Sequence, residues 1–253
     1  LERGMNCRWL GVVFAFFTAV AAFGIGNMVQ ANSIAQLAKE TFHISPWITG
    51  IIITVLTAVV ILGGVKSIAR TCEKLVPFMA IFYVAGCLIL LALKFETLPD
   101  TIMLILKSAF TGQAAMGGFL GAGMKEAMRF GIARGLFSNE SGLGSAPIIA
   151  AAAQTKNPVR QALVSSTGTF WDTVVVCLMT GLVIVNSGGW VGGLNGVALT
   201  KKAFEDFPIV GPTILTVGLL TFVFSTILGW SYYGEKAAEY LWGSKAIVAY
   251  RYL

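Results

Sequence analysis

The residues best suited to chemistry lie in the run RGLFSNESGLGSAP, from Arg134 to Pro147. Glycine forms helices poorly and proline lacks a backbone donor, so we predict one discontinuous helix, broken around residues 137–145. A break exposes carbonyls of the first half, which attract a cation, and amides of the second half, which attract a carboxylate. Glu140 would add a carboxylate at membrane depth. Four other side chains offer an apolar wall or polar contacts: Phe137, Ser138, Asn139 and Ser141.

A second motif, AFGIGNMVQANS, extends from Ala22 to Ser33. Its two glycines, Gly24 and Gly26, allow close backbone approach, while Asn27 and Gln30 are three residues apart and share a helical face. These polar side chains are typical of a cavity wall. They could equally form hydrogen bonds that only hold helices together, and the glycines of the broken helix could likewise only permit close packing.

A third motif, FVFSTILGWSYYGEK, contains adjacent Ser225 and Thr226 hydroxyls, with Trp230 four residues beyond Thr226. Oxygen ligands suit a hard cation such as sodium, and Trp230 could close an apolar pocket. Taken alone, the motif favours a plainer interpretation, in which the hydroxyls bond to their own helix and the aromatic residues form an interfacial belt. In a fourth motif, GTFWDTVVVC, we expect a structural role for Asp172 rather than direct ligand binding.

The composition indicates a polytopic membrane protein. The 253 residues are 56% hydrophobic and 12% charged, whereas a soluble domain is about 25% charged. A bilayer core of about 30 Å needs about 20 apolar residues in a helix. We predict a single transmembrane domain over residues 1–253, with Pro77 in the first turn of the third span and short surface helices at 99–107 and 201–207. The approximate spans are 10–36, 47–64, 75–93, 119–153 (discontinuous), 161–187 and 210–233.

The charge distribution predicts the orientation of these spans. With the first residue in the cytoplasm, nine basic residues occupy inner loops: Arg3, Arg8, Lys66, Arg70, Lys74, Lys156, Arg160, Lys236 and Lys245. Five occupy outer loops: Lys39, Lys94, Lys107, Lys201 and Lys202. The excess agrees with the positive-inside bias. Because the net charge of +6 is not gathered on one amphipathic element, we expect no nucleic-acid partner.

Three motifs together resemble one family. GLFSNESGLGSAP, followed by NPVRQALVSSTGTFWDT, resembles the signature region of the sodium:alanine (amino acid) symporters, whose members include alanine/glycine:cation symporters. FGIGNMVQANS and FSTILGWSYYGEK resemble two other helices of that family, in the same order and spacing. The resemblance covers essentially the whole chain. Two departures leave the substrate preference open: Ser141 stands where alanine is expected, and no histidine interrupts Ala150–Ala153.

The resemblance implies an all-α, leucine-transporter-type fold with two inverted repeats of five helices. The chain would then be an internal fragment that supplies the third to eighth core helices and the beginning of the ninth. The broken first core helix, central to substrate and sodium binding, would lie upstream. A multi-pass protein of a bacterial inner membrane follows as an expectation.

The resemblance also implies roles for individual residues. The substrate carboxylate would lie near Gly26 and Gln30, and its ammonium group would meet carbonyls around Phe137. Phe137 and Trp230 would limit the side-chain space. Sodium, the coupling ion, would bind Ser225 and Thr226. The full set expected at the substrate is Gly24, Gly26, Asn27, Gln30, Phe137, Ser138, Asn139, Ser141 and Trp230.

The predicted function is sodium-coupled symport of a small neutral amino acid, alanine or glycine, by alternating access in a lipid bilayer. No organic cofactor and no obligate protein partner are expected. The alternative is an ion channel or pore lined by the discontinuous helix. A membrane-embedded enzyme is disfavoured, because the sequence has one histidine and its two carboxylates at membrane depth, Glu140 and Asp172, are far apart along the chain.

Overall fold

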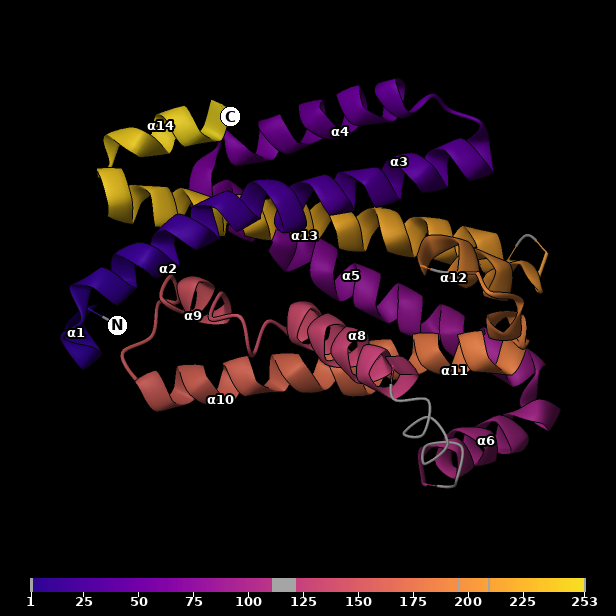
Figure 1. Ribbon diagram of the computed structural model, residues 1–253. Helices are drawn as coiled ribbons and strands as arrows, with labels where there is room; N and C mark the ends of the chain where they lie inside the picture. Colours follow the sequence, from indigo (N-terminus) through magenta and orange to yellow (C-terminus); the bar gives the residue numbers. More distant parts are fainter. Residues whose placement is uncertain (1, 111–121, 195, 209, 253) are drawn as a thin grey trace. The chain divides into compact units, whose positions relative to one another are not determined.

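The computed structural model describes residues 2–110, 122–194, 196–208 and 210–252, which form helices joined by turns without a strand (Figure 1). The predicted all-α class is confirmed for these residues, whereas the inverted-repeat arrangement stays a prediction. The chain divides into two compact units. The first unit comprises Leu1–Ile81 and Thr216–Leu253, and the second comprises Phe82–Leu215.

The first unit begins with one long helix. After the short α1 (Glu2–Met5), α2 (Arg8–Ala21), the π-helical segment η1 (Ala22–Met28) and α3 (Val29–Phe42) follow one another without a break. The helix stops at His43, whose φ of 56° is left-handed. α4 (Pro46–Ile61) then returns alongside α3, with Pro46 in its first turn, where a missing N–H costs nothing (Figure 1).

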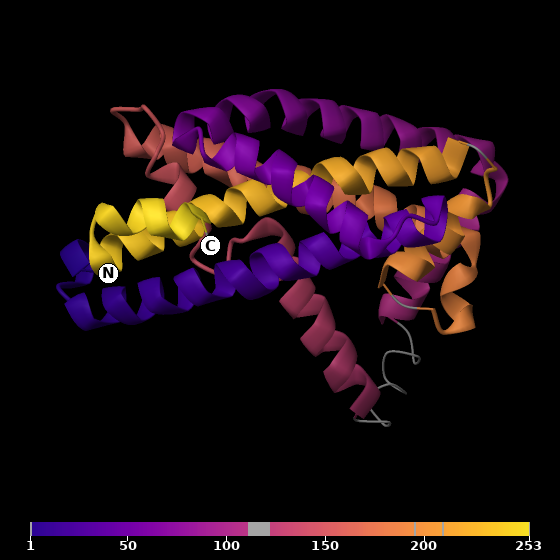
Figure 2. The ribbon, with the colours of Figure 1, turned by 90° about the horizontal axis from the view of Figure 1, so that it is seen from above.

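Three further helices complete the first unit: the beginning of α5 (Gly64–Leu93), the greater part of α13 (Val210–Trp242) and α14 (Lys245–Tyr252). Figure 2 shows α14 folded back along the end of α13. There the Tyr250 hydroxyl donates a hydrogen bond to the Ala19 carbonyl over 2.9 Å. One buried cluster packs Ile34 of α3 against Val223 and Ile227 of α13.

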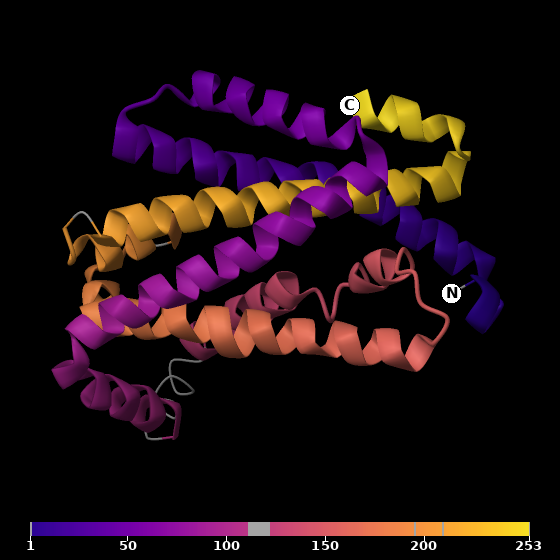
Figure 3. The ribbon, with the colours of Figure 1, turned by 180° about the vertical axis from the view of Figure 1, so that it is seen from behind.

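The second unit is built around another long helix, formed by α10 (Pro158–Thr169), the π-helical η3 (Phe170–Cys177) and α11 (Leu178–Ser187). α8 (Ala122–Asn139) contacts η3, and α9 (Ala146–Ala150) contacts α10, so both helices pack against this long helix (Figure 3). Residues 119–121 of the predicted discontinuous span lie outside the described residues. The smaller elements are η2 (Phe95–Thr97), α6 (Leu98–Phe110), η4 (Gly189–Gly192) and α12 (Gly196–Glu205).

Two helix boundaries differ from the prediction. α5 begins at Gly64, so Pro77 lies inside the helix and the prediction that it stands in the first turn was wrong. α13 continues to Trp242 rather than ending near residue 233. The prediction ended helices where apolar runs end, but a helix continues through polar residues when their side chains reach partners or water.

Within the described parts of the chain, four helices are long and apolar enough to cross a membrane: Arg8–Phe42, Gly64–Leu93, Pro158–Ser187 and Val210–Trp242. α4 is a shorter apolar helix. Large apolar side chains are exposed on several of these helices, as with Trp47 (83%), Val59 (71%) and Ile81 (71%). Such surfaces are unfavourable in water and suit lipid. Together these features indicate a multi-pass membrane protein.

An ion pair between a buried carboxylate and a partly exposed arginine joins α14 to α13. The Arg251 guanidinium donates from Nε to Glu235 Oε2 over 2.6 Å and from Nη2 to Oε1 over 2.9 Å. Glu235 is only 3% exposed. These hydrogen bonds raise the pKa of Arg251, which keeps the pair charged. A neighbouring pair, Lys236 with Glu239, is about one third exposed and supplies a comparison.

Replacing Arg251 by alanine should destabilise the protein by about 3–5 kcal/mol, because Glu235 would remain buried without this partner. Lys236→Ala should cost no more than about 1 kcal/mol, since both members of its pair are about one third exposed. The double variant Glu235→Ala/Arg251→Ala should be more stable than Arg251→Ala alone. Thermal unfolding of the full-length protein in detergent measures all three, and equal midpoints for Arg251→Ala and Lys236→Ala would contradict the argument.

Candidate functional site

The predicted site residues are divided between the two units, and each half is described by itself. The first unit holds Gly24, Gly26, Asn27, Gln30, Ser225, Thr226 and Trp230. The second unit holds Phe137, Ser138, Asn139 and Ser141.

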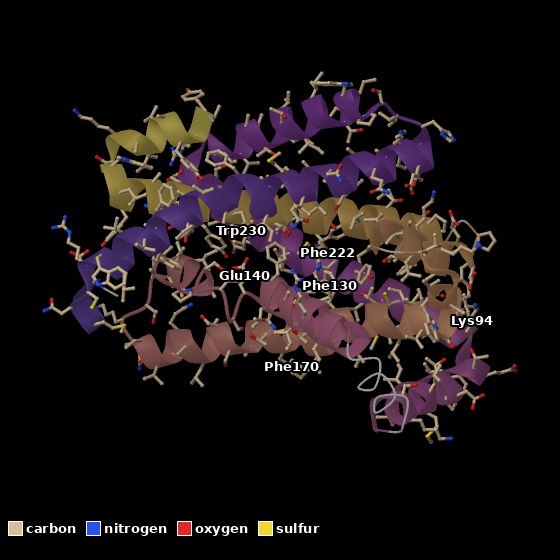
Figure 4. All side chains as sticks on the ribbon, in the orientation of Figure 1. Lys94, Phe130, Glu140, Phe170, Phe222 and Trp230 are labelled. Carbon is tan, nitrogen blue, oxygen red and sulfur yellow. The ribbon has the colours of Figure 1, made fainter. Side chains whose placement is uncertain are left out.

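In the first unit, Gly26 lies directly against Trp230. A Cβ atom added to Gly26 would lie 2.6 Å from Cγ and 2.7 Å from Cδ2 of that indole, so no larger residue fits. Trp230, labelled on α13 in Figure 4, is 5% exposed and meets Tyr233 edge to face, with centroids 5.5 Å apart. The close approach of η1 and α13 therefore fixes the position of the indole. A Cβ atom added to Gly24 would meet nothing within 4 Å.

Asn27 faces different neighbours from Gly26. It lines a cavity of about 560 Å³ within the first unit, between η1, α4, α13 and α14. Asn27 Oδ1 and the Thr57 hydroxyl both line it, and both are buried without a hydrogen-bond partner among the described residues. Buried polar atoms are normally bonded to protein or water. These two oxygens can therefore accept hydrogen bonds from a molecule in the cavity.

Ser225 and Thr226 both donate hydrogen bonds to the Phe222 carbonyl, each over 2.8 Å. This is the plainer interpretation of the motif, in which hydroxyls bond to their own helix. It does not remove them as cation ligands, because a donating hydroxyl uses its hydrogen and keeps its lone pairs. Bonding to one carbonyl also holds the two oxygens in defined positions on α13.

In the second unit, the helix is interrupted between Asn139 and Ala146. Glu140 adopts a left-handed φ of 57° there, and Gly144 a φ of 79°. The Ser141 amide donates to Asn139 Oδ1 over 3.0 Å, and the Ser145 hydroxyl donates to Glu140 Oε2 over 2.9 Å. Figure 4 labels Glu140 in this turn. The break is therefore a turn held by its own side chains.

Three side-chain hydrogen bonds also join the break to the long helix beside it. The Ser138 hydroxyl lies 2.9 Å from both carboxylate oxygens of Asp172. The Asn139 amide donates to the Thr173 hydroxyl over 3.3 Å. The Ser141 and Thr169 hydroxyls lie 2.8 Å apart. Three side chains predicted to meet the substrate are thus bonded within the protein, whereas Phe137, half-buried, precedes them on α8.

Sequence reasoning missed these partners and the two π-helical segments that carry much of the site. η1 coincides with the glycine-rich part of the second motif, and η3 contains Asp172 and Thr173. π-helical turns occur frequently at functional sites. The available signal was the group of polar residues, Thr169, Asp172 and Thr173, within an otherwise apolar span.

Comparison with known proteins bears on the whole chain. The model of the sodium:alanine symporter family matches residues 1–253, which confirms the predicted resemblance. A Methanococcus maripaludis protein named Sodium/alanine symporter AgcS is 50% identical over 259 residues, covering 99% of this chain and 56% of the relative. An uncharacterized transporter of Haemophilus influenzae is 52% identical over 255 residues, with the same two coverages. The Probable sodium/glutamine symporter GlnT of Bacillus subtilis is 34% identical over 252 residues, covering 98% of this chain and 52% of the relative. The chain spans about half the length of these relatives.

The contact between Gly26 and Trp230 predicts unequal effects at two neighbouring glycines. Gly26→Ala should destabilise the full-length protein by about 1–3 kcal/mol, because the added methyl group overlaps the indole. Gly24→Ala should be close to neutral in stability, since its methyl group enters open space. Thermal unfolding in detergent compares them. The packing argument fails if both variants unfold at the same temperature.

Proposed function

The chain belongs to the sodium:alanine symporter family, a family of transporters rather than enzymes, and we propose that the whole protein carries a small neutral amino acid, alanine or glycine, together with sodium. The match along all 253 residues carries this proposal. The protein would lie in the bacterial inner membrane as a multi-pass carrier with the leucine-transporter-type fold.

We propose that the site binds both charged groups of an amino acid, its ammonium group and its carboxylate. The last carbonyls of α8, around Phe137, carry the negative end of a helix dipole and suit the ammonium group. The carboxylate would lie near Gly26 and Gln30. Gln30 makes no hydrogen bond to any of the described residues, so its amide can donate to the carboxylate. Organic cofactors and protein partners have no part in this proposal.

A small substrate is supported by the position of Trp230. The indole is held against Gly26 and Tyr233, so it cannot withdraw without disturbing η1 or its own helix. The family resemblance implies Phe137 as a second wall, and a methyl group or hydrogen would then fit better than a long side chain. The name of the glutamine relative marks a different substrate for that protein, and the proposed preference therefore needs direct measurement.

Sodium would bind the lone pairs of Ser225 and Thr226, joined by oxygen ligands from parts of the protein outside this chain. Hard cations prefer such oxygen ligands. Coupling requires each ligand to raise the affinity for the other by the same factor. Sodium occupancy would thus favour amino-acid binding and the outward-open state, from which both are carried inward together.

Uptake of labelled L-alanine into proteoliposomes with the full-length protein tests the carrier. An inward sodium gradient should drive saturable uptake, which a potassium gradient should not support. Gln30→Ala should raise KM at least about tenfold, as expected for loss of a hydrogen bond to a charged group. Gln36→Ala is the matched control, because among the described residues the Gln36 side chain bonds to Glu40 of the same helix alone. Non-saturating ion flux without amino-acid uptake would favour the channel instead.

The sodium ligands are tested by a pair of threonines on α13. Thr226→Ala should raise the sodium concentration for half-maximal uptake by about tenfold, whereas Thr226→Ser keeps the oxygen and should restore most of the affinity. Thr221→Ala is the control, since Thr221 also bonds to carbonyls of its own helix. Equal sodium dependence in the alanine variants of Thr221 and Thr226 would remove Thr226 from the site.

A further inference from the structure

Asp172 is an acidic residue inside a helix long and apolar enough to cross a membrane. It is half-buried, and among the described residues no cation forms an ion pair with it. A carboxylate at membrane depth is costly and usually has a function. Its partners here are hydroxyl groups: Ser138 lies 2.9 Å from both oxygens, and Thr173 lies 3.2 Å from Oδ2.

The bond to Ser138 is one of three between the break and its neighbour. Ser138 and Asn139 end α8, and Ser141 follows in the break; they bond to residues 34, 34 and 28 positions further along the chain. The three partners lie within five positions, on the last turn of α10 and the first turn of η3. The link therefore lies where α8 ends and the backbone turns at Glu140.

The bond from Ser138 differs from the other two because its acceptor is charged. Hydrogen bonds to ionised groups are roughly twice as strong as neutral ones. Asn139 with Thr173 and Ser141 with Thr169 are neutral pairs. Asp172 thus makes the strongest of the three links, and it bonds to the last turn of α8, immediately after Phe137.

We propose that Asp172 is a positioning residue for substrate binding: through Ser138 it fixes the end of α8 and so aims the last carbonyls of that helix at the ammonium group. This inference rests on the proposed function. It also changes the roles expected for Ser138, Asn139 and Ser141, whose side chains hold the break in place rather than bind the substrate. The group presented to the substrate at this point is the backbone.

Three variants of the full-length protein separate geometry from charge. Asp172→Ala removes the acceptor and should raise the KM for L-alanine about tenfold, with a smaller change in kcat. Asp172→Asn keeps an oxygen for the Ser138 hydroxyl and should stay within about threefold of the wild type. Ser138→Ala should match Asp172→Ala, and the double variant should be no worse than either, because both remove one interaction. Asp100→Ala, at the exposed start of α6, is the control.

Hydrogen–deuterium exchange gives a second measurement that does not depend on transport. Asp172→Ala should speed amide exchange in residues 138–146, whereas Asp172→Asn and Asp100→Ala should not. If the wild type transports no amino acid, the proposed function fails, while this exchange result still decides whether Asp172 holds the break.

Two results would overturn the inference. Unchanged exchange and unchanged KM in Asp172→Ala would show that the break does not need this bond. Loss of sodium dependence in Asp172→Asn, equal to that in Asp172→Ala, would show that the charge itself is required, as for a cation ligand.

Discussion

A backbone that leaves its helix frees polar groups, and wherever water is excluded each of these groups must find a partner within the protein. The segment between Asn139 and Ala146 meets this requirement locally and through its neighbour. Within the turn, the Asn139 side chain accepts from the Ser141 amide, and the Glu140 carboxylate accepts from Ser145. Outside it, the long helix formed by α10, η3 and α11 supplies hydroxyls and a carboxylate. The uninterrupted helix of α10, η3 and α11 thus holds the interrupted α8 and α9 in place, and the packing of the second unit depends on this contact.

The first unit meets a different need, because apolar side chains gain little by packing together in lipid. Its helices instead approach closely where an aromatic residue covers a glycine. Tyr240 covers Gly11, Trp230 covers Gly26, and Tyr250 covers Gly234. These contacts join the first long helix, α13 and α14, and a Cβ atom at any of the three glycines would come too close to the aromatic side chain. The ion pair between buried Glu235 and Arg251 adds directional hydrogen bonds between α13 and α14.

The parts of the molecule that follow from local sequence were predictable, and those that depend on distant partners were not. Apolar runs gave the helices, and glycines with a proline marked the break before Ala146. The end of α13 was missed because charged residues such as Glu235 have partners that the apolar pattern does not show. Asp172 was assigned a structural role, but its bond to Ser138 joins residues 34 positions apart, and no local pattern reveals such a pair. The π-helical turns of η1 and η3 could not be predicted either, since a turn with one extra residue has the same amino-acid composition as a regular helical turn.

Those π-helical turns account for how neighbouring side chains come to serve different purposes. In a regular helix each side chain is rotated about 100° from the previous one. The side chains of a run of small and polar residues therefore point in evenly spaced directions around the helix axis. A π-helical segment changes this progression over one turn. In η1, Gly26 packs on the indole of Trp230 while Asn27, the next residue, lines a cavity. In η3, Asp172 and Thr173 are also consecutive, yet they bond to the hydroxyl of Ser138 and the amide of Asn139. The irregular turns thus let two successive residues reach different neighbours. In the first unit, Gly26 packs against an indole and Asn27 faces a cavity. In the second unit, Asp172 and Thr173 both hold the break in place.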